Sequence, residues 1–351
     1  MAAIAGIFAA QNATNVEKML KMMEHRERGI IKLHEHPGMT LGIIAKENKT
    51  QEAENTIVAD RAGDQHYALA GMSNGRFALS RDSVGVVPLY YGRRGDGALC
   101  FASEVKGLMM VSADINEFPP GCSYDGEKFA RHAEIIERVP RSESPDKIAG
   151  MLRFCLANAV QKRIASAEIG CYLSGGLDSS VMAALARPHV KRLQTVAAGI
   201  AGAPDLVYAR EVADFIESDH QEVVVKLEDM LRVLPAVIWH LESFDALLVR
   251  SSIMHYLASQ RISQYASEVF SGEGGDELFA GYIYLKTMPR EKLPAELVSI
   301  TKRLHNTALQ RVDRCAAAFG LRAHVCFLDT EVVDLALEIP IDLKPHAGIE
   351  K

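Results

Sequence analysis

The stretch Ile169-Gly170-Cys171-Tyr172-Leu173-Ser174-Gly175-Gly176-Leu177-Asp178-Ser179-Ser180 decides the fold of the larger part of this chain. Its apolar run ends at two glycines, and an apolar, alanine-rich run over residues 181–186 follows. This order predicts a strand, a tight turn and a helix. The glycines let the backbone approach an anion closely. The hydroxyls of Ser174, Ser179 and Ser180, with N–H groups at the start of the helix, would hold phosphate oxygens.

Asp178 lies in the same turn, where its carboxylate would not bind phosphate directly but can hold a Mg²⁺ ion that does. The turn lacks the G-K-[ST] of a Walker A loop and the G-x-G-x-x-G of a dinucleotide loop. It resembles instead the S-G-G-x-D-S-S loop of ATP pyrophosphatases, which split ATP between the α and β phosphates. That resemblance implies ATP and Mg²⁺ as cofactors, with Ser174, Gly175, Gly176, Asp178, Ser179 and Ser180 around the pyrophosphate.

The bulk composition is that of a globular enzyme. The 351 residues suffice for two domains, and 48% of them are hydrophobic. A net charge of -6 gives no basic field for a nucleic-acid partner. The first residues lack the charged start of a signal peptide, and no apolar run is long enough to span a membrane. The six cysteines form no C-x-x-C pair, so we expect a cytoplasmic enzyme with reduced thiols.

The chain changes character along its length. Residues 1–137 carry short apolar runs with period-two alternation, including 3–9, 40–45, 77–79 and 86–91, and predict a small β-rich domain. Residues 138–147, rich in proline and charge, predict a linker. From 148 to 351 the pattern alternates between helices expected at 148–164, 209–216, 229–241 and 251–265 and strands expected at 169–173, 193–200, 222–225 and 268–270. This alternation predicts an α/β domain whose parallel sheet is covered by helices, preceded by the smaller β-rich α+β domain.

A second glycine loop, Ser271-Gly272-Glu273-Gly274-Gly275-Asp276-Glu277, follows the last of these strands. Three acids within five residues are costly to place together unless a cation balances them. Taken alone, this loop is more typical of a solvated surface loop than of a metal site. Beside the first loop, Asp276 would supply a second Mg²⁺ ligand opposite Asp178. Glu273 would act as an acid or base, or recognise an amine.

These segments carry a family resemblance. The loop 174–180, the run S-G-E-G-G-D-E-L-F-A-G-Y at 271–282 and Phe327-Leu328-Asp329 resemble the synthetase half of glutamine-hydrolysing asparagine synthetases. Supporting matches occur at 199–206, 241–245, 250–252 and 312–314. The resemblance covers residues 148–351. It implies an AMP-forming ligase that adenylates aspartate and then transfers ammonia to it.

The same resemblance implies further site residues. Ala198, Gly199 and Ile200 correspond to the segment that receives adenine, while Ser271, Gly272 and Glu273 would face the reacting acyl group. Lys351 corresponds to the last lysine of a G-K-x-x-K stretch, which contacts the α phosphate in the family. Two alternatives stay open for Lys351, namely a catalytic lysine ordered by ATP or a partner, and a disordered chain end.

The N-terminal part resembles the family's glutaminase over Arg81–Tyr91, Phe101–Lys106 and Glu117–Gly121. The family uses a cysteine after Met1 as its nucleophile, and here that position is Ala2. The family's R-G-P-D motif is degraded around 25–29, and the domain is shorter than its relatives. We therefore predict that residues 1–137 form a shortened, Cys-less domain that cannot hydrolyse glutamine.

The synthetase half also departs from the family pattern L-E-[AV]-R-V-P-F-L-D. Over residues 321–329 an acid is replaced by Arg322, an arginine by His324 and a proline by Cys326. We interpret His324 as a structural substitution rather than a new base.

Three hypotheses follow from the residues together. The first is an asparagine synthetase-like ligase fed by free ammonia. The second is a related amide-forming enzyme that acts on another carboxylate. The third is a non-catalytic, nucleotide-binding or assembly subunit. In each case a homo-oligomer or a nitrogen-supplying partner protein is compatible with the sequence.

Overall fold

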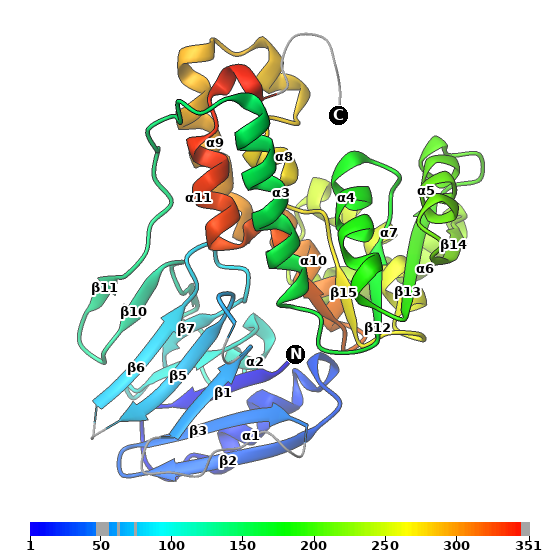
Figure 1. The fold of residues 1–351 in the computed structure, drawn as a ribbon. Helices are drawn as coiled ribbons and strands as arrows, with labels where there is room; N and C mark the ends of the chain where they lie inside the picture. The colour runs from blue at the N-terminus through cyan, green and yellow to red at the C-terminus, as the bar shows by residue number, and fades with distance from the viewer. Residues whose placement is uncertain (47–55, 62–63, 74–75, 345–351) are drawn as a thin grey trace. The chain divides into compact units, whose positions relative to one another are not determined.

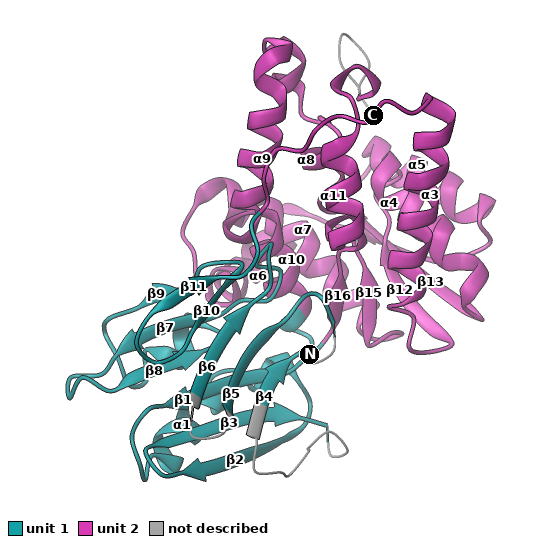
Figure 2. Ribbon diagram, turned by 60° about the vertical axis from the view of Figure 1, so that its left-hand side comes forward, with its two compact units in different colours: residues 1–134, 317–320 teal, residues 135–316, 321–351 magenta. Residues whose placement is uncertain are grey.

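The computed structural model describes residues 1–46, 56–61, 64–73 and 76–344. The chain divides into two compact units (Figure 1, Figure 2). Unit 1 comprises residues 1–134 with 317–320, and unit 2 comprises 135–316 with 321–351.

Unit 1 is built on two antiparallel sheets, as its short alternating runs predict. In order across each sheet, the first contains β2 (Ile30–His36), β3 (Met39–Ala45), β1 (Ala3–Ile7), β8 (Leu99–Ala102), β7 (Tyr90–Arg93) and β9 (Asn116–Glu117). The second contains β11 (Phe129–Arg131), β10 (Cys122–Tyr124), β6 (Arg76–Arg81), β5 (Ala68–Ser73) and β4 (Thr56–Asp60). Buried side chains such as Leu41, Phe101 and Leu79 form one core from both sheets. A second core packs α1 (Ala13–Lys21) against the first sheet, and α2 (Val105–Leu108) follows β8.

The predicted strand over 86–91 is wrong in its first half. The carboxylate of Asp82 accepts backbone N–H groups from Val84, Gly85, Val86 and Val87 at 2.7–3.1 Å. Those N–H groups are consequently unavailable to a ladder, and the strand begins only at Tyr90. An aspartate that binds nearby backbone thus overrides the apolar pattern.

Unit 2 contains the parallel sheet that the sequence predicts, in the order β14 (Asp219–Val224), β13 (Arg192–Gly199), β12 (Glu168–Tyr172), β15 (Glu268–Phe270) and β16 (Arg322–His324). Each of these five strands begins with a charged residue. The amino edge of the sheet therefore carries charge, while the interiors of β12, β13 and β15 are largely buried.

Helices cover both faces of this sheet. The α-helices of the described part of unit 2 are α3 (Pro145–Gln161), α4 (Leu177–Ala186), α5 (Pro204–Phe215), α6 (Leu227–Leu241), α7 (Ala246–Ile262), α8 (Gly275–Leu278), α9 (Leu293–Arg303), α10 (Ala308–Ala317) and α11 (Thr330–Glu338). Successive side chains of β12 show the two faces. Cys171 Sγ lies 4.0 Å from the carbonyl oxygen of Ser179 in α4, and Tyr172 Oη lies 2.7 Å from Ser259 Oγ in α7. The predicted α/β class with helix-covered parallel strands is confirmed.

Helices α3 and α5 begin several residues earlier than predicted, because their prolines start them rather than end them. Pro145 occupies the first turn of α3, and the hydroxyl of Ser144 accepts the N–H of Lys147 at 3.4 Å. Pro204 likewise opens α5. Proline suits the first helical position, where its missing N–H would have no intrahelical partner.

The six cysteines all lie among the described residues and are free thiols. Burial raises the pKa of Cys100 to about 11 and raises that of Cys171 further, so these thiols stay protonated at neutral pH. No helix of the described part of the chain is both long and apolar enough to cross a membrane.

Candidate functional site

The first glycine loop joins the end of β12 to the start of α4 and is closed by its own serines. Ser179 Oγ accepts the backbone N–H of Ser174 at 3.1 Å and donates to the carbonyl oxygen of Gly176 at 3.1 Å. Ser180 Oγ also donates to that carbonyl oxygen, at 2.8 Å. The hydroxyls therefore hold the turn in shape, and an anion would bind at the N–H groups with which α4 begins.

Gly175 has to be a glycine for two reasons. Its φ of +77° lies in the left-handed region, and a Cβ there would overlap Tyr208 and lie 2.6 Å from the N atom of Ala209. Both neighbours belong to α5. The first loop therefore lies directly against α5, on the carboxyl edge of the sheet.

The structure brings the two glycine loops into contact. A Cβ on Gly272 would lie 2.8 Å from the N atom of Ser179 and 3.1 Å from Cβ of Asp178. A Cβ on Gly275 would overlap the carboxyl group of Asp178. The backbone of the second loop thus abuts the acid of the first, and Asp276 is the next residue after that contact.

The second loop is held from its other side by the segment 324–329. Ser271 N–H donates to the carbonyl oxygen of His324 at 2.9 Å. Gly274 has a φ of +98°, and a Cβ there would lie 2.8 Å from Cγ of Leu328. The Phe327-Leu328-Asp329 segment therefore supports the loop by packing.

Glu277 and Glu273 of the second loop are balanced in different ways. Glu277 is buried, and desolvation together with the charges of Glu273 and Asp276 raises its pKa. Its carboxylate accepts a hydrogen bond from the hydroxyl of Tyr282. Glu273 forms an ion pair with Arg311, whose Nη2 donates to Oε1 at 2.5 Å.

Arg311 is a site residue that the sequence pattern does not reveal. It lies on α10, and its Nη1 also donates to Ser251 Oγ on α7 at 3.2 Å. Burial opposes its charge, but the charge of Glu273 and the hydrogen bond to it raise the pKa of Arg311 overall. Its only signal in the sequence is its place just before the family-like segment at 312–314.

The half-buried His255 of α7 lies near Arg311 of this ion pair. Burial, followed by the charge of Arg311, lowers the pKa of His255 to about 3. The ring of His255 lies 4.3 Å from that of Tyr172. The imidazole is therefore neutral at physiological pH and acts as a packing group.

The donor set suits Mg²⁺. Among the residues described, no cluster of three or more histidines, cysteines or acids could hold a metal ion. Mg²⁺ is usually bound by one or two carboxylates together with substrate phosphates and water. Asp178 and Asp276, which belong to two loops in contact, would be the carboxylates of such a site.

The segment predicted to receive adenine lies at the end of β13. Ala198 and Gly199 are its last two residues on the carboxyl edge, where the carbonyl oxygen of Gly199 accepts Val225 N–H at 2.8 Å. Ile200 follows them and is 54% exposed. Lys351 lies outside the described residues, so its two alternatives stay predictions.

The altered segment 321–329 has structural partners. His324 Nε2 lies 3.1 Å from Glu268 Oε2, and this joins β16 to β15. Asp329 forms ion pairs with Arg163 at 2.8 Å and with Lys162. It also accepts the N–H of Glu331 at the start of α11. These contacts support the interpretation of His324 as a structural substitution.

In unit 1, the position of the family's nucleophile is buried and carries only a methyl group. Ala2 N–H donates to Asp60 Oδ1 at 2.9 Å. Asp60 Oδ2 pairs with Arg26 at 3.1 Å, and Arg26 pairs in turn with Glu104 Oε1 at 2.8 Å. Ion pairs fill this part of unit 1 without a reactive side chain at residue 2.

Two contacting glycine-acid loops on the carboxyl edge of a parallel sheet are typical of α/β proteins that bind a ligand at that edge. Residues 151–299 and 286–351 match the asparagine synthase family, and residues 49–120 match the glutamine amidotransferase domain. The chain belongs to the asparagine synthase family.

Curated relatives agree with this assignment. The glutamine-hydrolysing asparagine synthetases of Gallus gallus and Homo sapiens are each 35% identical over 323 residues, which cover 81% of this chain and 58% of theirs. A second such synthetase from Arabidopsis thaliana is 33% identical over 307 residues, covering 81% of this chain and 53% of its own. The chain therefore spans a little over half the length of the curated relatives it matches.

Among solved structures, a glutamine phosphoribosylpyrophosphate amidotransferase from B. subtilis aligns with a TM-score of 0.34 and 12% identity, covering 70% of this chain and 94% of its own. A score this low supports no conclusion about function.

Proposed function

We propose that this chain is an ATP-dependent amide ligase that forms AMP and pyrophosphate, with aspartate as the acceptor acid and ammonia as the nitrogen donor. The contact between Gly275 and the carboxyl group of Asp178 carries the proposal, because it brings the two acidic loops together at that carboxyl group. Membership of the asparagine synthase family supports the same chemistry.

In the first step, an oxygen of the acceptor carboxylate attacks the α phosphorus of ATP. The bond between that phosphorus and the bridging oxygen breaks, and pyrophosphate leaves. The N–H groups at the start of α4 would stabilise the charge that develops on pyrophosphate. Mg²⁺ held by Asp178 and Asp276 would neutralise further charge on the same oxygens.

In the second step, ammonia attacks the acyl carbon, and the bond from that carbon to the AMP oxygen breaks. The nitrogen must then lose a proton. Glu273 is the candidate to accept it, and its ion pair with Arg311 fixes the position of its carboxylate. By family resemblance, Lys351 would contact the α phosphate.

The alanine at position 2 bears on the source of the nitrogen. A methyl group cannot attack glutamine, so unit 1 would supply no ammonia of its own. The ammonia would come from solution or from a partner protein. We place the enzyme in the cytoplasm, where both substrates are small soluble metabolites.

A second candidate acceptor is supported by Arg322, His324 and Cys326. They replace family residues in the segment that packs against the second loop. A second loop supported by different residues would be shaped for a carboxylate other than aspartate.

The test is to incubate the full chain with ATP, Mg²⁺ and ammonium and to offer a panel of carboxylic acids. We expect AMP, pyrophosphate and asparagine in equal amounts with aspartate. Asp178→Asn should abolish all three, whereas Asp205→Asn, an exposed aspartate on α5, should abolish none. Pyrophosphate released with a different acid alone would favour the second acceptor. If no acid in the panel caused release, only a non-catalytic role would be left.

Glutamine in place of ammonium should give no asparagine. Asparagine formed from glutamine would overturn the assignment of unit 1 as inactive.

A further inference from the structure

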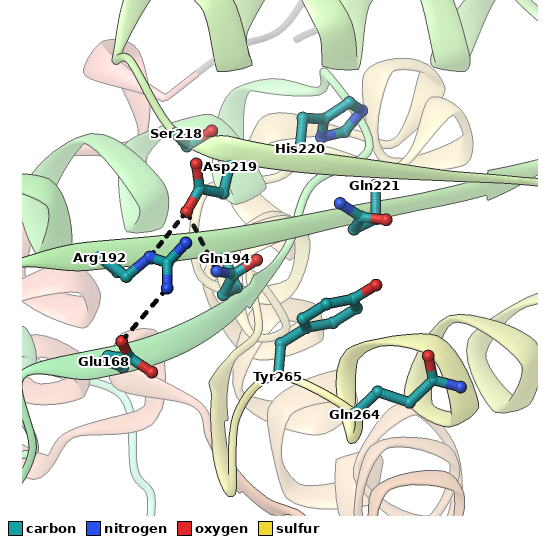
Figure 3. A pocket seen from close by; sticks show the side chains of 9 residues that line it. All are labelled: Glu168, Arg192, Gln194, Ser218, Asp219, His220, Gln221, Gln264 and Tyr265. Atoms are coloured by element: carbon teal, nitrogen blue, oxygen red, sulfur yellow. Dashed lines mark hydrogen bonds and ion pairs between the residues drawn. The ribbon is translucent and has the colours of Figure 1, made fainter.

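A cavity of about 670 Å³ opens at the amino edge of the parallel sheet in unit 2 (Figure 3). Its lining comes from the first residues of three strands and from the segment after α7, and comprises Glu168, Arg192, Gln194, Ser218, Asp219, His220, Gln221, Gln264 and Tyr265. The first glycine loop leaves from the carboxyl end of β12, one of these strands, and the second leaves from the carboxyl end of the neighbouring strand β15. The cavity is therefore separate from the proposed catalytic site.

The charges of the cavity leave a net negative balance. Arg192 Nε donates to Asp219 Oδ2 at 3.1 Å, and Arg192 Nη1 lies 3.7 Å from Glu168 Oε1. One guanidinium thus faces two carboxylates. Burial lowers the pKa of His220, so the imidazole adds no charge at neutral pH. The cavity should attract an ammonium group and repel a ligand with excess carboxylates.

The rest of the lining is rich in carboxamides. Gln194 is 4% exposed, and its Nε2 donates to Asp219 Oδ2 at 3.1 Å. In the described part of the chain its Oε1 has no partner, nor do the side-chain amides of Gln221 and Gln264. Figure 3 shows the ring of Tyr265 among these amides. A carboxamide both donates and accepts, so it pairs best with another carboxamide.

These features together match one kind of small molecule. An α-ammonium group complements Glu168 and Asp219. An α-carboxylate complements Nη2 of Arg192, the guanidinium nitrogen that faces neither acid. A side-chain carboxamide complements Gln194, Gln221 and Gln264. A volume of several hundred Å³ is typical of small-molecule sites and leaves room for bridging water.

We propose that this cavity binds a free α-amino acid with a carboxamide side chain, of the asparagine or glutamine type. The cavity disfavours the corresponding acids because their extra carboxylate would add negative charge to a cavity in which Arg192 already faces two carboxylates. This binding is independent of the proposed ligase activity, since it uses the opposite edge of the sheet.

The test is calorimetric titration of the full chain with asparagine, glutamine, aspartate, glutamate and putrescine. We expect saturable binding of one or both amides, at least tenfold tighter than that of the matching acid. The double variant Glu168→Gln/Asp219→Asn should weaken amide binding at least tenfold and remove the preference for the amide over the acid. Glu211→Gln, an exposed acid on α5, should change neither.

Asp178→Asn separates this site from the catalytic one, because it should stop pyrophosphate release and leave amide binding unchanged. Gln264→Ala should weaken amide binding and leave pyrophosphate release unchanged. No saturable binding of either amide would overturn the proposal. The proposal would also be overturned if the double variant bound the amides as tightly as the unaltered chain does. Putrescine binding more tightly than both amides would likewise overturn it, because it would indicate a simple cation site.

Discussion

Gly275 is the residue at which the two acidic loops meet. Replacing it with alanine would drive a methyl group into the carboxyl group of Asp178. Displacing a catalytic group by about 1 Å can cost on the order of 100-fold in rate. We therefore expect Gly275→Ala to lower pyrophosphate release by about 100-fold.

Gly150 provides the matched control. It lies in α3, and a Cβ there would meet open space. Gly150→Ala should leave the rate unchanged and raise stability by roughly 0.5–1 kcal/mol, as alanine does in helices. Equal rates for the two variants, measured by a pyrophosphate assay, would mean that the loops do not act together.

Arg311 and Glu273 form an ion pair that only the folded chain reveals. A double-mutant cycle with Arg311→Met and Glu273→Gln should show a coupling free energy of unfolding of about 1–3 kcal/mol, because Arg311 is largely buried. The exposed pair Arg232 and Asp229, at 2.6 Å, should couple by less than about 1 kcal/mol. Urea unfolding measures both cycles, and equal couplings would contradict a special role for Arg311.

Among the predicted site residues, those in the two glycine loops were accessible from sequence because glycine and acid spacing constrains the backbone locally. Arg311 was not, because its partner lies 38 positions away in the chain. Nothing in the local pattern distinguishes it from an ordinary charged residue on a helix.

At the scale of elements, β15 and β16 are joined by a side-chain pair as well as by their ladder. Burial raises the pKa of Glu268, but the hydrogen bond and charge of His324 outweigh it and lower that pKa. His324→Ala would leave the carboxylate without this partner and should cost about 1–3 kcal/mol of unfolding free energy. His324→Arg, which restores the family's residue, should cost less.

Chemical denaturation of the two variants shows whether His324 stabilises the fold. If His324→Ala were as stable as the unaltered chain, the histidine would not act structurally.

Most elements of unit 2 were predictable, because buried parallel strands read as short apolar runs between amphipathic helices. The strand over 268–270 lies where predicted. β16 was not predicted, since it has only three residues and is defined by pairing with β15 across 54 positions. The starts of α3 at Pro145 and of α5 at Pro204 were also not predicted, because a proline can either end one element or begin the next.

For the whole molecule, His255 predicts how stability depends on pH. The imidazole has an ordinary pKa of 6.5 when unfolded and about 3 when folded. Between these values the unfolded chain binds more protons, so stability is complete above pH 6.5 and falls as the pH drops towards 3. The slope for this one group is at most about 1.4 kcal/mol per pH unit.

His255→Gln should flatten the fall in melting temperature between about pH 6.5 and pH 4.5. His189→Gln, at an exposed position, should not. Parallel curves for His255→Gln and the unaltered chain would show that this histidine does not titrate with unfolding.

The central claim for the molecule is that its two loops adenylate a carboxylate. The most direct measurement uses aspartate labelled with ¹⁸O in its carboxylates, together with ATP, Mg²⁺ and ammonium, and analyses the nucleotide product by mass spectrometry. Attack by the carboxylate on the α phosphorus leaves one of its oxygens on AMP when ammonia displaces the acyl group. We predict AMP that carries one ¹⁸O atom for each asparagine formed. Unlabelled AMP, or ADP with inorganic phosphate, would contradict the account.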